Sequence, residues 1–230
     1  MIGNRTAQGK MVRSVLLAIA TVLLSGCYDV SMDVDLHNDG SGTIAATSVM
    51  SKEVTDKFQR TGKGDDISLF ADKNKAARVS RKIQNGRFTI IENLSFQKLS
   101  EVNLGDFNFE VIDLGRTFYG IDRSRIRWAI RSQSEGNEPK TTPKDAAEAA
   151  RYKGYFFTLT MHLPCHVAQA GKLSAGGAVI TPTIRSAFWN GSTVVWKVPM
   201  ELIAENDNAK PRIFEVNCWS WYGIQAGKTR

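Results

Sequence analysis

Short segments in which apolar and polar residues alternate recur along this chain, and they restrict it to a fold built largely from half-buried strands. The clearest example is Tyr28–Leu36, in which valine, methionine and leucine alternate with serine and aspartate. A period of two places successive side chains on opposite faces of a strand. One face of this segment is therefore expected to be buried, and the other to contact solvent.

Turn residues separate the alternating segments and predict how they pair. Asp39-Gly40-Ser41-Gly42 follows the first strand, and the dipeptides Asn85-Gly86 and Asn190-Gly191 are typical of tight hairpin turns. The predicted hairpins pair Tyr28–Leu36 with Thr43–Val49, Arg78–Gln84 with Arg87–Glu92, and Ile180–Phe188 with Thr193–Leu202. Further strands are expected at Phe107–Val111 and Phe118–Ile121 around a turn at Gly115, and at Ile126–Ile130, Tyr155–Leu163 and Ile213–Tyr222.

Capping residues indicate a few short helices between the strands. Ser51 and Ser95 are good N-cap residues for helices at 51–58 and 95–102, and Pro143 after Thr142 is typical of the first turn of a third helix, which would end at Arg151. These elements predict an α+β fold with predominantly antiparallel hairpins and two or three short helices. Residues 27–230 are expected to form a single compact domain.

The N-terminus has the pattern of an export signal that ends at a cysteine. Basic residues precede the apolar run Val15–Leu24, which is too short to cross a bilayer that needs about 20 helical residues. Leu24-Ser25-Gly26-Cys27 then places two small residues directly before a thiol. This stretch resembles the lipobox of bacterial lipoproteins. The resemblance implies a signal peptide at 1–26, cleavage after Gly26, and a diacylglyceryl group and an N-acyl chain on Cys27.

Lipid on Cys27 would hold the protein on a membrane, because two or three acyl chains are enough for stable anchoring. Translation from Met1 or Met11 gives the same mature protein, and the alternative is an ordinary secretory signal with a chance cysteine. The first strand follows without a spacer, so the body is expected to lie close to the bilayer. In the inner-membrane retention signal an acidic residue directly follows the lipidated cysteine, whereas here Asp29 is the second residue after Cys27. The periplasmic face of the outer membrane is therefore favoured over the inner membrane.

The charge of the chain argues against nucleic-acid binding. Arg5, Lys10 and Arg13 leave with the signal peptide, which lowers the formal net charge from +7 to +4. This mild excess is compatible with anionic lipid headgroups. The membrane and another envelope protein are therefore the expected partners, with no nucleic acid.

Cys165 and Cys218 are expected to form a disulfide, because they remain as an even pair in an oxidising compartment. Closing a loop of about 53 residues stabilises the fold by roughly 4 kcal/mol in the chain-entropy model. The alternative is a zinc site in which His162 and His166 join the two cysteines. Zinc sites usually contain two pairs of ligands, each pair close together in the sequence, and Cys218 has no second ligand near it. We therefore predict no metal and no cofactor beyond the lipid.

Two groups of side chains are candidates for interaction with a partner. The arginine row consists of Arg123, Arg125, Arg127 and Arg131. It is explained either as a charged, solvated strand face that prevents edge pairing or as a site for anions and headgroups. Trp219 and Trp221 lie two residues apart beside Cys218, so they share a face. A disulfide-braced aromatic patch of this kind could bind a partner or an amphipathic ligand.

Several of these features together resemble the LppM-like domain of bacterial lipoproteins. They are the lipobox, the strand that ends in Asp39-Gly40-Ser41-Gly42, the expected helix near Ser95, and the late strand Val194-Val195-Trp196-Lys197-Val198-Pro199-Met200. The resemblance implies an α+β domain at the cell envelope, and it carries no catalytic residues over to this chain.

The sequence favours a non-enzymatic function. It has no Gly-x-Ser-x-Gly motif and no phosphate-cradling glycine loop, and its acidic pair Asp65-Asp66 lies in a polar segment. The leading hypothesis is a lipid-anchored envelope protein that docks another envelope component. A carrier or sensor of a lipid or amphipathic ligand, and a metal-binding module on the two cysteines and their histidine neighbours, are the alternatives.

Replacing the lipobox cysteine tests the proposed anchor. In Cys27→Ala the thiol that would accept the diacylglyceryl group is gone, so the variant should incorporate no radiolabelled palmitate and should retain residues 1–26. The matched control Cys165→Ala should be labelled like the wild type. An unlabelled wild-type protein that keeps its first 26 residues would contradict the lipoprotein assignment.

Overall fold

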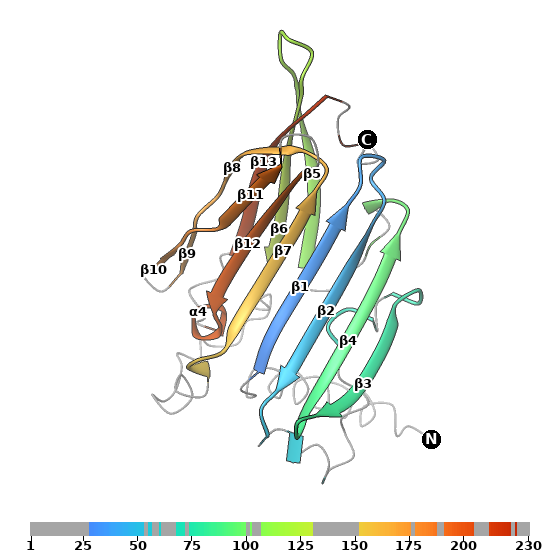
Figure 1. The fold of residues 1–230 in the computed structure, drawn as a ribbon, viewed down its shortest axis with the longest axis vertical. Helices are drawn as coiled ribbons and strands as arrows, with labels where there is room; N and C mark the ends of the chain where they lie inside the picture. Colours follow the sequence, from blue (N-terminus) through green and yellow to red (C-terminus); the bar gives the residue numbers. More distant parts are fainter. Residues whose placement is uncertain are drawn as a thin grey trace, which may run out of the picture.

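The computed structural model, shown in Figure 1, describes most of the predicted domain. It describes residues 28–52, 55–56, 60, 68–71, 74–99, 102, 107–130, 152–175, 178–187, 191–204, 212–221 and 224. The signal peptide, Gly26, Cys27, Arg131 and the predicted helix at 142–151 lie outside these residues.

Thirteen strands and one short helix carry the described fold. They are β1 (Tyr28–Leu36), β2 (Gly42–Met50), β3 (Arg78–Gln84), β4 (Arg87–Phe96), β5 (Phe107–Arg116), β6 (Asp122–Ile130), β7 (Phe156–Leu163), β8 (His166–Ala170), β9 (Leu173–Ala175), β10 (Ala178–Ile180), β11 (Thr183–Ala187), β12 (Gly191–Pro199), α4 (Met200–Ala204) and β13 (Arg212–Ser220). No helix among the described residues is long and apolar enough to cross a membrane.

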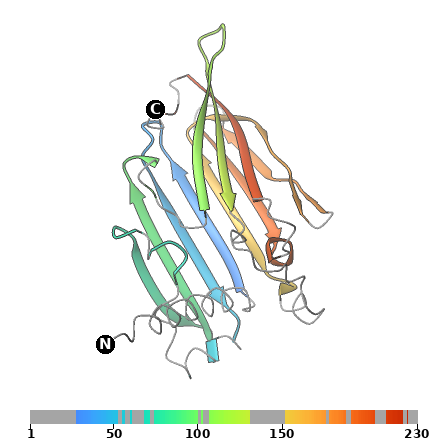
Figure 2. The same cartoon turned by 180° about the vertical axis from the view of Figure 1, so that it is seen from behind.

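The strands form two larger sheets that lie face to face. The large sheet has seven strands in the order β11-β12-β7-β1-β2-β4-β3, and the small sheet has four in the order β5-β6-β13-β8. Figure 2, turned by 180° from Figure 1, shows the small sheet in front of the large one. Neighbouring strands are antiparallel except β1 and β7, which run parallel. The short strands β9 and β10 pair separately.

The alternation predicted for the first strand decides which face of the large sheet is buried. Val30, Met32 and Val34 on β1 are buried, whereas the serine and aspartates between them are exposed or half-buried. The buried face packs against Phe214 of the small sheet, whose ring lies 5.9 Å from Phe157 and 5.6 Å from Trp196, centroid to centroid. No described element covers the opposite face of the large sheet, which presents polar side chains such as Asp33, Asp35 and His162.

The chain passes from the large sheet to the small one at a corner that the predicted disulfide closes. β7 ends at Leu163 and β8 begins at His166, and between them Cys165 bonds to Cys218 of β13, with a Cα–Cα distance of 5.6 Å. Gly191 crosses closely over this corner. Its φ of 88° is unfavourable for other residues, and a Cβ there would collide with the Leu163 carbonyl oxygen.

The predicted α+β class is wrong, because the described residues are mostly strand. The first two residues of the expected helix at 95–102 belong to β4, where Ser95 pairs with Thr43 while Leu94 and Phe96 point into the core. Pairing with the long strand β2 outweighed the local capping signal. Farther along, Val102 N donates to the Leu99 carbonyl at 3.1 Å, as in a short helical turn. Of the expected helix at 51–58, the described part shows a helical hydrogen bond from Thr55 N to the Ser51 carbonyl, and most of it lies outside the described residues.

Several strand boundaries also differ from the prediction, and the expected strand at 180–188 is divided between β10, which ends at Ile180, and β11, which begins at Thr183. The expected turn at Gly115 is a bulge within β5, and the chain turns instead at 117–120, so Phe118 and Tyr119 are not in a strand. The expected strand through Leu202 ends at Pro199, and Leu202 lies in α4.

One buried acidic side chain attaches a loop to the large sheet. Glu92 of β4 is fully buried, and its carboxyl oxygens accept hydrogen bonds from the backbone N–H groups of Leu69, Phe70 and Ala71 at 2.6, 2.9 and 2.9 Å. These bonds hold the Phe70 ring in the core, where it is fully buried. A buried donor that loses its acceptor costs about 1–3 kcal/mol.

Removing this carboxyl group should loosen the loop and the core together. Glu92→Ala is expected to lower the free energy of unfolding by about 3 kcal/mol, because three backbone donors lose their acceptor. Urea denaturation measures the change, with Asn93→Ala, at an exposed neighbouring position, as the control. Equal stability of the two variants would contradict the role given to Glu92.

Candidate interaction surface

The arginine row lies on the outer face of the small sheet, where acidic side chains accompany it. Arg127 Nη1 is 2.9 Å from Glu110 Oε1, and Arg127 Nε is 3.5 Å from Glu215 Oε2. Arg125 Nε donates to Asn217 Oδ1 at 3.1 Å and lies 3.5 Å from Glu215 Oε1. These contacts join β5, β6 and β13 across the sheet. The charges of Arg125 and Arg127 are therefore compensated within the chain, as expected for a solvated strand face.

Arg123 differs from its two neighbours in the row. Its Nη2 donates to the Leu114 carbonyl at 3.0 Å, and it stands beside Trp219 in the register of β6 and β13. It is exposed. Arg123 therefore belongs to the same stretch of surface as the predicted tryptophan patch, and Arg131 lies outside the described residues.

The two predicted tryptophans are exposed at the end of β13. Trp219 and Trp221 have 46% and 61% of their surface accessible. Trp219 lies directly after Cys218 and pairs with His166 of β8 in register, so the disulfide fixes the strand from which it projects. The structure thus places this pair at a braced end of the small sheet.

A second aromatic pair, which the sequence reasoning placed in a strand, lies at the tip of the β5–β6 hairpin. Phe118 and Tyr119 are 100% and 81% exposed, and their rings form an edge-to-face pair with centroids 5.7 Å apart. The hairpin projects beyond both sheets (Figures 1 and 2). Gly120 directly after the pair, with a φ of 80°, was the sequence signal that could have located this turn.

These four residues gather at one end of the molecule, and we call Phe118, Tyr119, Trp219 and Trp221 the aromatic end. The hairpin tip and the end of β13 both lie at the top of Figures 1 and 2, whereas β1 starts at the bottom. Trp219 and Arg123 connect the two pairs through the register of β13 and β6. Exposed apolar side chains that cluster in this way mark interaction sites more often than scattered ones.

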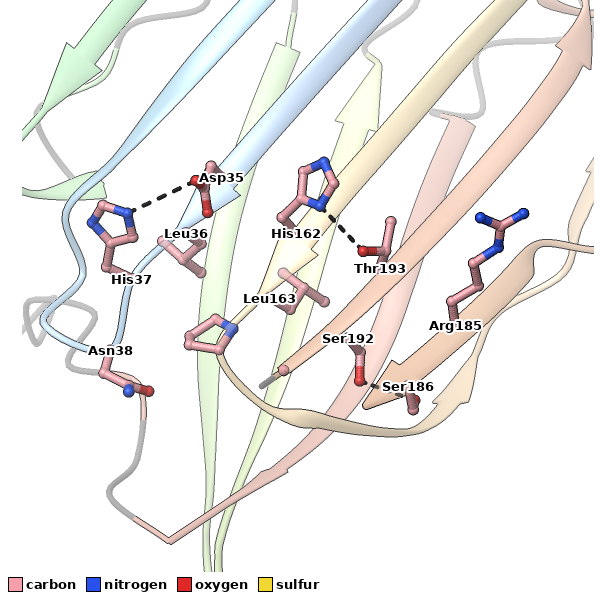
Figure 3. A pocket seen from close by; sticks show the side chains of 12 residues that line it. Asp35, Leu36, His37, Asn38, His162, Leu163, Arg185, Ser186, Ser192 and Thr193 are labelled. Atoms are coloured by element: carbon pink, nitrogen blue, oxygen red, sulfur yellow. Dashed lines mark hydrogen bonds and ion pairs between the residues drawn. The ribbon is translucent and has the colours of Figure 1, made fainter. Parts of the chain in front are cut away.

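A polar groove opens at the same end, on the open face of the large sheet. It has a volume of about 540 Å³, and Figure 3 shows its lining where β1 and β7 end and β12 begins. His162 lies 3.3 Å from Asp33 through Nε2, and its Nδ1 is 3.1 Å from Thr193 Oγ1. Asp35, His37 and Arg185 also line it. The groove offers hydrogen-bonding groups of both charges and is open to solvent.

The zinc alternative does not fit the described residues. The sulfurs of Cys165 and Cys218 are bonded to each other and are not available as thiolate ligands. His162 faces the open side of the large sheet, whereas Cys165 is buried at the corner. The described residues contain no group of three or more histidine, cysteine, aspartate or glutamate side chains placed to hold a metal ion.

No protein-family model and no curated protein matches this chain. A solved structure that is similar to it is the NMR structure of the folded domain of the LppM protein of Mycobacterium tuberculosis. The match covers 85% of this chain and 91% of the other, with 11% sequence identity and a TM-score of 0.41.

The β5–β6 hairpin, which carries Phe118 and Tyr119, is clamped by an ion pair whose effect can be measured. Arg116 Nε and Nη2 donate to the two carboxylate oxygens of Asp122 at 2.7 and 3.1 Å, which lowers the pKa of Asp122 below its usual 3.8. A lowered carboxyl pKa favours the folded state at neutral pH, and this contribution is lost as the pH falls through the lowered pKa.

Removing the arginine should return the carboxyl group to ordinary behaviour. In Arg116→Gln, the pKa of Asp122 is expected to rise toward 3.8, because the charged donor that stabilises the carboxylate is lost. An NMR titration of the side-chain carboxyl carbon measures it. Asp113 provides the internal control in the same spectra, and an unchanged Asp122 titration would show that the ion pair does not form in solution.

Proposed function

We propose that this protein is a lipid-anchored, non-enzymatic component of the bacterial cell envelope that docks another envelope component through the aromatic end. The observation that carries the proposal is the position of the aromatic end, opposite the start of β1 (Figures 1 and 2). The lipobox at Leu24–Cys27 supplies the anchor in this proposal.

The chain geometry links the two features. Cys27 directly precedes Tyr28, the first residue of β1, so the two Cα atoms are about 3.8 Å apart. β1 has nine residues, and a strand of this length spans about 30 Å. A lipid on Cys27 would therefore hold the starting end of β1 at the membrane. The aromatic end then faces away from that membrane when the strands stand upright on it.

The composition of the aromatic end suits protein docking. Tyrosine, tryptophan and arginine are enriched among the residues that contribute most to binding between proteins. The aromatic end has two tryptophans and one tyrosine, and Arg123 stands beside Trp219. The disulfide at Cys218 restrains the strand that carries Trp219, which reduces the entropy lost on binding.

A carrier of lipid chains is less well supported. The region between the two sheets, where a carrier would hold an acyl chain, is filled by the fully buried side chains of Trp128, Trp196 and Phe214. Most side chains that line the groove at the end of β1 are polar, and they suit hydroxyl or charged groups better than a long hydrocarbon chain.

Substitution of the tryptophans tests docking directly. The double variant Trp219→Ala and Trp221→Ala is expected to reduce the yield of crosslinked complex in intact cells by at least about tenfold, as for loss of interface hot spots. The control is Ile83→Ala together with Val179→Ala, which removes exposed apolar side chains from other parts of the surface.

The thermal melting temperature should change little in either double variant, because the substituted side chains are exposed. If the tryptophan double variant gave as much crosslinked complex as the wild type, docking through Trp219 and Trp221 would be contradicted.

A further inference from the structure

The tip of the β5–β6 hairpin, Thr117–Gly120, presents two aromatic rings that nothing else in the described chain covers. Phe118 is fully exposed and Tyr119 nearly so, although each is large enough to bury a substantial apolar area. The tip lies beyond the ends of the neighbouring strands, as Figures 1 and 2 show from opposite sides. It can therefore enter a cavity on another molecule without moving the rest of the fold.

The tip is held in one shape by a dense set of local hydrogen bonds. Thr117 N donates to the Ile121 carbonyl at 2.8 Å, Gly120 N donates to the Thr117 carbonyl at 3.0 Å, and Ile121 N donates to Thr117 Oγ1 at 3.1 Å. The ion pair between Arg116 and Asp122 closes the hairpin directly below. The edge-to-face ring pair is thus displayed on a restrained support.

This restraint distinguishes between two kinds of partner. A bilayer interface is fluid and accepts aromatic side chains in many orientations, so it gains little from a fixed pair of rings. A pocket on a protein has a fixed shape, and a preorganised tip that matches it binds with a smaller entropic cost. The restrained backbone of the tip therefore favours a protein pocket.

The charges around the tip point in the same direction. Four charged side chains flank it, Asp113, Arg116, Asp122 and Arg123, and their formal charges cancel. Attachment to anionic headgroups depends on an excess of basic residues. The tip has no such excess, so the attraction must come from the rings themselves.

We propose that Phe118 and Tyr119 insert as a preformed pair into an apolar, concave pocket on a partner protein of the cell envelope. The inference rests on the proposed docking function and deepens it, because it names the contact and the chemistry of the partner surface. Phe118 fills the base of the pocket. Tyr119 packs at its rim, where its hydroxyl group reaches a polar partner.

Site-specific photocrosslinking in intact cells tests the insertion. A benzophenone amino acid replaces Phe118 in the full-length protein, and a second strain carries it at Ile83, which is exposed on edge strand β3. The expected result is one discrete protein adduct from position 118 that position 83 does not give. Mass spectrometry should locate the crosslink among apolar residues of that partner.

Binding of the purified partner then provides the quantitative test. Phe118→Ala should weaken the Kd at least about tenfold, as for a hot-spot residue, and Ile83→Ala should leave it unchanged. Tyr119→Phe keeps the ring and should retain most of the affinity, whereas Tyr119→Ala should not. Each variant is checked for an unchanged melting temperature.

Three results would overturn the inference. They are a lipid adduct from position 118, an adduct at the mass of two copies of this chain, or no adduct above the level at position 83. If the double variant Trp219→Ala and Trp221→Ala loses its crosslinked complex while any of these three results is obtained, docking through the tryptophans is retained and insertion of the hairpin tip is rejected. If the tryptophan variant also kept its complex, the proposed function would fail as well.

Discussion

Packing between the two sheets fixes the position of β13 and of the surface residues that this strand carries. Phe214 of the small sheet is fully buried between Phe157 and Trp196 of the large sheet, and Trp196 Nε1 donates to the Gly171 carbonyl at 3.1 Å. Full burial of each such ring contributes about 1.5–3 kcal/mol. The disulfide from Cys165 to Cys218 ties the corner between the sheets to the same strand, β13. The core and the covalent bond thus fix β13 and, through it, the surface that it carries.

Because the apolar side chains face inward, the outer faces of the two sheets are polar and internally satisfied. Arg125 and Arg127 of β6 contact Glu110 and Glu215, and the open face of the large sheet presents the pair of Asp33 and His162. Large exposed aromatic rings concentrate instead at the ends of strands, at the hairpin tip and after Cys218. A rigid scaffold with binding residues on its loops and strand ends is a common arrangement in proteins. The docking surface that we propose lies at one end of the fold, and the anchor proposed at Cys27 lies at the other.

The sequence predicted many of the strands well, because the alternation of buried and exposed side chains and the turn residues are local features of the sequence. The alternation in Tyr28–Leu36 matches β1 residue for residue, and Asn85-Gly86 forms the turn between β3 and β4, with φ values of 52° and 70°. The disulfide followed from the number of cysteines. The prediction of a helix N-cap at Ser95 and the prediction of a strand at Phe118 were wrong for different reasons. Pairing with β2, distant in sequence, extended β4 through the expected cap, and a bulge at Gly115 moved the turn onto the aromatic pair. The pairing of the arginines with Glu110 and Glu215 depends on the order of strands in the small sheet, which the sequence does not reveal.

The orientation of the lipidated protein on a bilayer tests the account most directly. In Tyr119→Cys and Gln84→Cys the introduced thiol is the sole free one, since Cys27 is acylated in this account and the other cysteines are bonded to each other. Gln84 lies at the turn between β3 and β4, at the same end of the large sheet as the start of β1, and position 119 lies at the hairpin tip. Energy transfer from a dye at each position to acceptors on lipid headgroups compares their distances from the membrane. With the lipid anchor at the start of β1, transfer is expected to be strong from position 84 and weak from position 119. Equal transfer from both positions, or stronger transfer from the tip, would contradict this orientation.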